Sequence, residues 1–208
     1  MIDKIKQKVA ALLEEMEEPS VLVVEAGRGA KEPELRVIGL FADVIEEKVA
    51  EIILSLLYFN EQNKALKKEK RKGVDFYLST YGGSADDMFA LYDIMKQVEE
   101  TTPISTIGVG KVMSAGVLLL AAGTPGKRKI GRNCRVMLHS VIAGNQGSLH
   151  NLINEMEAIQ DLQEMYIERL VEETKMTKKQ LKKMLEQKVN IYLSAEEAVE
   201  YGIADEII

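Results

Sequence analysis

Residues Ile104–Gly116 read Ile-Ser-Thr-Ile-Gly-Val-Gly-Lys-Val-Met-Ser-Ala-Gly, and this stretch decides the fold. Its first half is short, apolar and β-branched, which favours a strand, whereas the apolar block Val117–Ala122 that follows favours a helix. Ser114 therefore lies where a strand gives way to a helix. Unpaired N–H groups and the helix dipole favour negative charge at such a point, which suits a hydroxyl that must become an alkoxide.

A histidine follows the next strand-like run, Arg135–Leu138. A serine at a helix start is usually a cap, and a histidine at a strand end is usually structural. Together, Ser114 and His139 provide a nucleophile and its base at the ends of buried elements. The interpretation depends on the pair, because neither residue carries it alone.

Composition limits the possible functions. The 208 residues are 46% hydrophobic, enough for one sizeable core, so we expect a single α/β domain with an appendage. A net charge of −6 argues against nucleic acid or an anionic membrane as a partner. No apolar run approaches the length of a membrane span, which favours a cytoplasmic protein.

The few cysteines and histidines argue against a metal site. Cys134 is the single cysteine, which excludes an intrachain disulfide and fits a reducing compartment, and we expect it to be a small buried hydrophobe. His139 and His150 are the two histidines, and with one cysteine they form no metal cluster. We therefore expect neither a metal nor an organic cofactor.

Strand and helix patterns alternate at least three times in the middle of the chain, which predicts a parallel sheet with right-handed crossovers. Catalytic groups would then gather at the carboxyl ends of the strands. The predicted elements before Pro103 are a helix at Ile2–Met16, strands at Val21–Val24, Leu35–Phe41 and Val74–Leu78, and helices from Ile45 to Phe59 and from Met88 to Val98.

The last third is predicted to be mainly helical. Residues 141–147 read as an edge strand or an irregular arm, and a long helix with a broad apolar stripe follows at about Ser148–Glu173. That stripe is wide enough to serve a neighbouring subunit as well as the core. The remaining predicted elements are a helix at Thr177–Gln187 capped by Thr177, a capping box at Ser194–Glu197 opening a helix that Gly202 stops, and a strand at Ile203–Ile208.

Three other motifs would indicate a different chemistry from that of the serine and histidine pair. Gly108 and Gly110 make no dinucleotide loop, because position 113 is Met. The hydrolase elbow G-x-S-x-G is absent, because Val112 occupies its first glycine position. Lys111 lies one turn before Ser114 and could suggest a Ser-Lys dyad, but a lysine there is more often solvated.

Three segments together resemble the Clp protease proteolytic subunit (ClpP) family. They are Tyr81–Gly83, the stretch from Val112 to His139, and Tyr192–Gly202. Each fragment alone is weak, but the three occur in order, with the family's spacing between serine and histidine. The resemblance covers roughly residues 20–208.

The resemblance implies a catalytic role for five residues. Ser114 matches the nucleophile and His139 the general base, while the amides of Gly83 and Ala115 match the two donors of an oxyanion hole. The family's third triad residue, an aspartate, falls on Asn190, giving a Ser-His-Asn variant. The resemblance implies no cofactor.

The resemblance also implies a fold and an assembly. The fold would be a ClpP/crotonase-type spiral of β-β-α units with a protruding handle helix at about residues 141–175. The peptidase domain would span 19–208, preceded by an amphipathic helical extension at 1–18. Two stacked heptameric rings would enclose the active sites. An arginine usual at the ring contact is replaced by Val189, and docking of a ring ATPase unfoldase stays open.

The sequence therefore indicates a serine endopeptidase that hydrolyses peptides or unfolded proteins inside a ring chamber of an ATP-dependent complex. A first alternative is a weak or inactive ring subunit that assembles with an active paralogue, and its support is Asn190 with Val189. A second is a crotonase-type enzyme acting on a coenzyme A thioester, which the pairing of Ser114 with His139 disfavours. Peptide specificity, the ATPase partner, and a homo-oligomer versus a hetero-oligomer are left open.

Overall fold

A single sheet organised around the long strand β3 (Ile104–Met113) forms the centre of the protein. The structure is a computed structural model that describes residues 35–208 except 145 and 188. The helix expected at residues 1–18 and the strand expected at Val21–Val24 lie outside the described residues.

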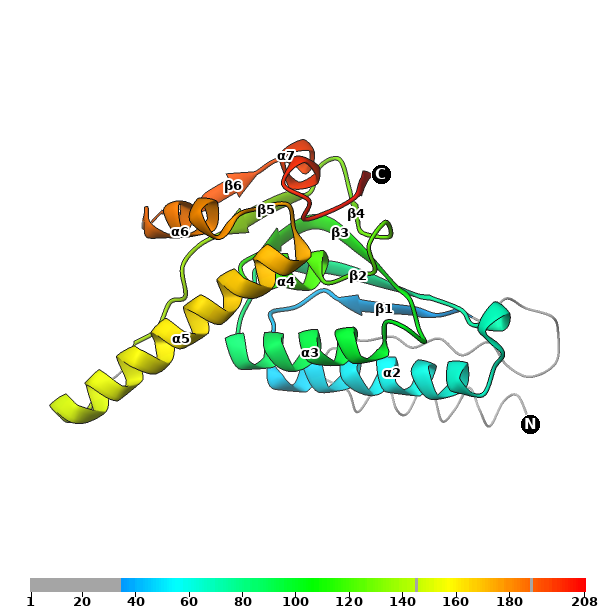
Figure 1. Ribbon diagram of the computed structural model, residues 1–208, viewed down its shortest axis with the longest axis horizontal. Coiled ribbons are helices and arrows are strands. Elements are labelled where there is room, and N and C mark those ends of the chain that lie inside the picture. The colour runs from blue at the N-terminus through cyan, green and yellow to red at the C-terminus, as the bar shows by residue number, and fades with distance from the viewer. Residues whose placement is uncertain (1–34, 145, 188) are drawn as a thin grey trace, which may run out of the picture.

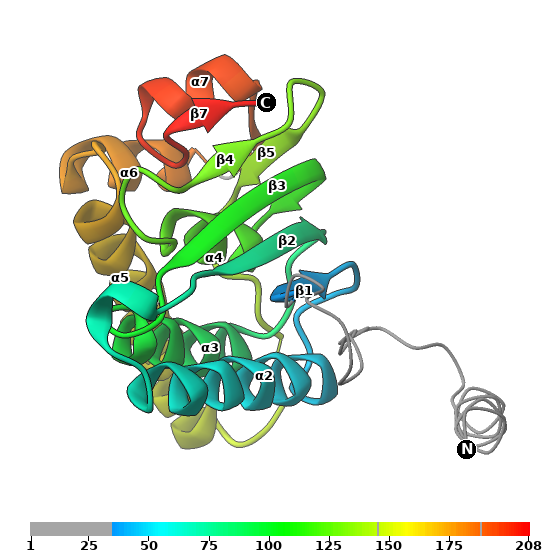
Figure 2. The ribbon, with the colours of Figure 1, turned by 90° about the vertical axis from the view of Figure 1, so that its right-hand side faces the viewer.

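Strand β3 pairs along its length with different neighbours. Strand β2 pairs with it on one side, from Ile104 to Val112 with a register shift between Leu78 and Thr80. On the other side, β4 pairs with its first half and β5 pairs with its second half. The predicted parallel sheet is confirmed (Figure 2). The exception is β6, which pairs antiparallel with β5. The other strands are β1 (Val37–Leu40), β2 (Val74–Thr80), β4 (Lys129–Ile130), β5 (Arg135–Leu138), β6 (Ile191–Leu193) and β7 (Glu206–Ile207).

The helices agree closely with the sequence prediction. In chain order they are α2 (Glu46–Lys64), the short 3-10 helix η1 (Lys68–Lys70), α3 (Ala85–Val98), α4 (Ala115–Ala121), α5 (Leu149–Glu173), α6 (Lys178–Glu186) and α7 (Ala195–Glu200). Helices α2 and α3 pack against each other beside the β1 end of the sheet, as Figure 2 shows. The described residues between 141 and 147 contain no strand, so the irregular arm is the alternative that the structure supports.

Helix α4 is the central helix of the core, because every one of its seven residues is buried. It contacts β2 and β3 on one side and α3 and α5 on the other. Thr106 of β3 donates its hydroxyl to the Leu120 carbonyl at 2.7 Å. Each fully buried leucine in such a site contributes roughly 1.5–3 kcal/mol. Ser114 precedes this helix, so the core fixes its position.

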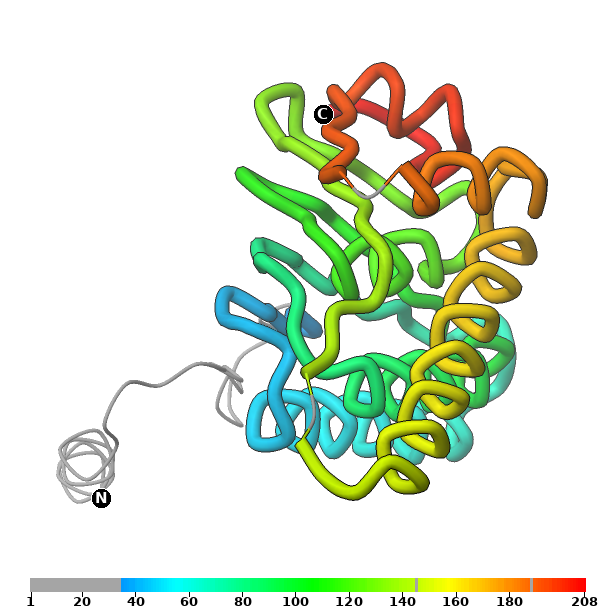
Figure 3. Tube along the Cα trace, turned by 90° about the vertical axis from the view of Figure 1, so that its left-hand side faces the viewer, coloured from blue at the N-terminus to red at the C-terminus, as the bar shows by residue number. Residues whose placement is uncertain are grey.

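Helix α5 extends away from the rest of the domain at its N-terminal end (Figures 1 and 3). Among its residues only Tyr166, Ile167 and Leu170 are buried, all near its C-terminal end. Leu149 and Met156 are 69% and 61% exposed, so the N-terminal part of its apolar stripe is largely uncovered within the described chain. This arrangement is what an interface with a neighbouring subunit requires.

Local capping signals account for the last helices. Thr177 and Ser194 each form the full capping box, and the Ser194 amide donates to the Glu197 carboxylate at 2.8 Å. Gly202 ends α7 with φ of 77°, where an L side chain is strained and a Cβ would lie 2.9 Å from the Lys175 amide nitrogen. The predicted terminal strand is shorter than expected, because Ile203 and Ala204 turn back beneath α7 and donate to the Ala198 carbonyl.

Arg128 joins three parts of the chain. Its guanidinium donates to both carboxylate oxygens of Asp205, at 2.9 and 2.5 Å, and also to the carbonyls of Ala121 and Glu173. The Gly126 amide donates to the same carboxylate. The Arg128 guanidinium holds the pKa of Asp205 below its usual range, because the ionised carboxylate accepts these hydrogen bonds. The end of α4, the end of α5 and the C-terminal segment are therefore fixed to one another.

Replacing Asp205 by asparagine is expected to cost about 2 kcal/mol or more in the free energy of unfolding at pH 7, because Arg128 is 9% exposed and would lose its counterion. The folded pKa is lowered, so this stabilisation is present above the ordinary carboxyl pKa and is lost as pH falls through the folded value. Urea unfolding at a series of pH values measures both effects. Glu164→Gln is the control, because that carboxylate forms solvent-exposed ion pairs. Equal losses in the two variants would contradict the role given to Arg128.

Candidate active site

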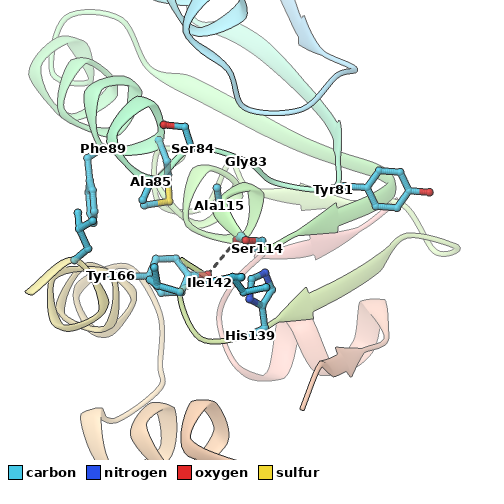
Figure 4. A pocket seen from close by; sticks show the side chains of 13 residues that line it. Tyr81, Gly83, Ser84, Ala85, Phe89, Ser114, Ala115, His139, Ile142 and Tyr166 are labelled. Carbon is cyan, nitrogen blue, oxygen red and sulfur yellow. Dashed lines mark hydrogen bonds between the residues drawn. The ribbon is translucent and has the colours of Figure 1, made fainter. Parts of the chain in front are cut away.

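A cavity of about 380 Å³ opens at the carboxyl ends of β3 and β5, where Ser114 and His139 follow their strands. Both side chains lie at this cavity (Figure 4). The sequence expectation that catalytic groups gather at this edge agrees with the position of the cavity. The lining residues are Tyr81, Gly83, Ser84, Ala85, Met88, Phe89, Ser114, Ala115, His139, Val141, Ile142, Leu162 and Tyr166.

Ser114 has a backbone conformation found at no other non-glycine residue that the structure describes, with φ of 54° and ψ of −122°. It occupies the N-cap position of α4, yet its side chain accepts no hydrogen bond from the helix. The interpretation of Ser114 as a simple helix cap therefore fails. A strained residue persists only where its surroundings hold it, and such residues cluster at functional sites.

Two glycines bring the loop after β2 close to Ser114. A Cβ added to Gly82, whose φ is 104°, would lie 2.5 Å from the Ser114 Cβ. A Cβ added to Gly83 would collide with the backbone of Val44. The Gly82 carbonyl accepts from the Val44 amide at 2.7 Å, which fixes the loop. Gly83 and Ala115 both line the cavity, so the two expected oxyanion donors come from separate segments, the loop after β2 and the start of α4.

The His139 ring is half-buried, and its Nδ1 lies 2.5 Å from the carbonyl oxygen of Ser140. A carbonyl only accepts, so this contact requires the tautomer with the proton on Nδ1. The other ring nitrogen, Nε2, is then able to accept a proton. Within the described chain no hydrogen bond joins the Ser114 and His139 side chains, and catalytic contacts often tighten only when substrate binds.

Asn190 lies just before β6, whose antiparallel register pairs Ile191 with Leu138. Extended by one residue, this register sets Asn190 opposite His139. The Asn190 side chain is exposed, does not line the cavity, and makes no hydrogen bond to His139 in the described residues. The fold thus brings Asn190 near the histidine, while its role as third triad member stays a prediction.

A family model described as Clp protease matches residues 33–208, most of the chain. This protein belongs to the Clp protease family. The family is one of serine peptidases, and the mixed α/β structure agrees with the ClpP-type fold expected from the sequence. None of the helices in the described part of this Clp protease family member is long and apolar enough to cross a bilayer.

Three further residues contact Ser114 or His139 at the candidate site, and the sequence assigned them no role there. Tyr166 donates its hydroxyl to the Ser114 carbonyl, Gly82 makes room for Ser114, and Ser140 accepts from His139. A tyrosine within an otherwise apolar helical stripe was the available signal for Tyr166, since a buried hydroxyl needs a partner. No residue type could have signalled Ser140, because its contribution is a main-chain carbonyl.

Lys111 and Cys134, for which the sequence indicates no catalytic role, lie outside the cavity lining. The Lys111 ammonium lies 4.4 Å from the centre of the Tyr81 ring and is not part of the cavity lining, which disfavours a Ser-Lys dyad. Cys134 is buried, and burial raises the pKa of its thiol to about 11. Across the described residues, no group of histidine, cysteine and carboxylate side chains could hold a metal ion.

Proposed function

We propose that this member of the Clp protease family is a serine endopeptidase with Ser114 as nucleophile, His139 as general base, and the Gly83 and Ala115 amides as oxyanion donors. The conformation of Ser114 carries the proposal, because a strained serine with an uncapped side chain faces the same cavity as His139. Family membership supports the peptidase class.

The reaction follows from this arrangement. The Ser140 carbonyl holds the proton on Nδ1 of His139, so Nε2 takes the Ser114 proton as the hydroxyl oxygen attacks the peptide carbonyl. The carbonyl oxygen becomes an oxyanion, to which the Gly83 and Ala115 amides donate. His139 returns the proton to the leaving amine as the peptide bond breaks. Water, deprotonated by His139, then attacks the acyl-enzyme. The ester bond to Ser114 breaks, the serine oxygen takes the proton back from His139, and the acid is released.

We infer further that the subunit assembles into two stacked heptameric rings that enclose the sites. The exposed apolar stripe of α5 supports assembly, because an isolated subunit would leave that surface in water. Peptides or unfolded proteins are the substrates proposed, with a ring ATPase unfoldase as a partner that the family suggests.

A second candidate is a weak or silent ring subunit that assembles with an active paralogue. Asn190 favours it, because an amide supplies no negative charge to the imidazolium that forms on His139. Val189, 56% exposed, favours it too, because it stands where the resemblance implies a ring-contact arginine.

A fluorophosphonate probe separates these candidates. The purified full chain is expected to be labelled at Ser114, as read by peptide mass spectrometry, and to have the native mass of a ring assembly. Labelling supports the endopeptidase. An unlabelled ring supports the silent subunit, and an unlabelled monomer contradicts the endopeptidase. The probe tests Ser114 directly, so a contaminating peptidase cannot produce the expected result.

Replacing Asn190 by aspartate is expected to raise turnover roughly tenfold or more. The register sets residue 190 opposite His139, and a carboxylate would accept the Nδ1 proton more strongly than the Ser140 carbonyl does. Hydrolysis of a fluorogenic peptide measures the change, with Asn190→Ala as control. An unchanged rate in Asn190→Asp, with Ser114 still labelled by the probe, would show that residue 190 is not the third member of the triad.

A further inference from the structure

The hydroxyl of Tyr166 links the long helix α5 to the backbone of the proposed nucleophile. Its oxygen lies 3.0 Å from the Ser114 carbonyl oxygen, to which it donates, and Figure 4 shows the tyrosine beside Ser114 at the cavity. The Val117 amide donates to the same carbonyl at 2.9 Å, and the Ser114 amide donates to Met137 at 2.8 Å. Ser114 is thus held by its main chain on both sides.

The Ser114 carbonyl belongs to the same peptide unit as the Ala115 N–H. A trans peptide is planar, so the carbonyl and the N–H point in opposite directions and turn together. A donor that fixes the carbonyl therefore fixes the direction of the N–H, which is the proposed oxyanion donor. Hydrogen bonds in a chain also polarise one another, so a donor at the carbonyl strengthens the N–H as a donor.

Tyr166 is suited to this task by its burial. It is 5% exposed, and burial raises the pKa of its phenol well above the usual value, so the hydroxyl keeps its proton. It is also the first buried residue of α5 in chain order, where the helix meets the core. Its ring separately lines the cavity. The ring and the hydroxyl can therefore be tested apart.

We propose that Tyr166 is a positioning residue, whose hydroxyl holds the Ser114–Ala115 peptide in the orientation that stabilises the oxyanion. This inference rests on the proposed function and deepens it, because it names the side chain that orients one of the two proposed oxyanion donors. The Tyr166 hydroxyl contacts the Ser114 carbonyl and not the attacking oxygen, so it acts through the peptide unit. Its effect belongs to the transition state, where the oxyanion exists, and not to substrate binding.

Tyr166→Phe is the test, and Tyr92→Phe is its matched control. Tyr92 is also 5% exposed and donates one hydroxyl hydrogen bond, to Glu173 at 2.8 Å, but it does not line the cavity. Both variants keep the ring and lose one buried hydrogen bond, so similar decreases in Tm are expected. Only Tyr166→Phe is expected to lose kcat, by about tenfold, with KM unchanged.

Hydrogen exchange of the segment 113–118 gives a readout that does not need activity. Faster exchange in Tyr166→Phe, with Tyr92→Phe like the parent, is the expected result. Equal exchange, equal kcat in the two variants, or a loss confined to KM would overturn the positioning role. If the parent is not labelled by the probe, the peptidase proposal fails, and the exchange comparison still decides whether Tyr166 holds this peptide.

Discussion

Replacing Ser114 by alanine is expected to abolish probe labelling and to lower peptide hydrolysis by at least about 10³-fold, because the attacking oxygen is lost. The fold should be unaffected. The Ser114 hydroxyl caps no helix, and alanine and serine are about equally strained at a φ of 54°. The free energy of unfolding is therefore expected to change by less than about 0.5 kcal/mol. Hydrolysis and urea unfolding, measured on the same preparation, check both parts.

The control for this variant is Ser105→Ala. Ser105 lies at the other end of β3, and its hydroxyl donates to the Lys127 carbonyl at 3.1 Å, away from the cavity. Its loss should leave turnover unchanged. Equal residual hydrolysis in Ser114→Ala and the parent would show that another residue performs the reaction.

Replacing Gly82 by alanine is expected to lower kcat by about 10²-fold or more. The new methyl group would lie 2.5 Å from the Ser114 Cβ and 3.0 Å from its Oγ, so the nucleophile or the loop must move. The loop carries Gly83, one of the two proposed oxyanion donors, and losing a single such donor costs about 10²–10³-fold. Steady-state kinetics on a fluorogenic peptide measure the loss.

Gly126→Ala separates backbone strain from the steric effect. Gly126 also has a positive φ, of 81°, but nothing lies within 4 Å of an added Cβ. Alanine there should reduce stability by about 1 kcal/mol and leave kcat unchanged. A similar fall in kcat for both variants would mean that contact with Ser114 is not the cause.

Long helices and strands, and elements whose limits are marked by local sequence signals, were predicted well from the sequence. The change from strand to helix at Ser114, the limits of β5, the N-cap at Thr177 and the capping box at Ser194 depend on neighbouring residues, and the structure confirms them. The strands β4 and β6 were missed. They have two and three residues, too few for a periodicity, and they form only because distant strands present open edges.

The candidate site also has a part that could be predicted from the sequence and a part that could not. Ser114 and His139 could be proposed from their places beside strands, and the structure brings both to one cavity. The contacts of Tyr166 and Ser140 could not be predicted, because they depend on how α5 crosses α4 and on a main-chain oxygen. Asn190 shows the limit: the register brings it opposite His139, but the orientation of its side chain follows from no pattern in the sequence.

The backbone of Ser114 has a consequence for how this position can evolve. A left-handed conformation costs a non-glycine residue of order 1–3 kcal/mol, and glycine would adopt it almost freely. Selection for stability alone would therefore favour glycine at position 114, and a subunit without a catalytic role would lose no function through that substitution. Serine occupies this position although its side chain makes no cap hydrogen bond to the helix. A strained residue with an uncommitted hydroxyl is what a catalytic role predicts, and it favours the endopeptidase over the silent subunit.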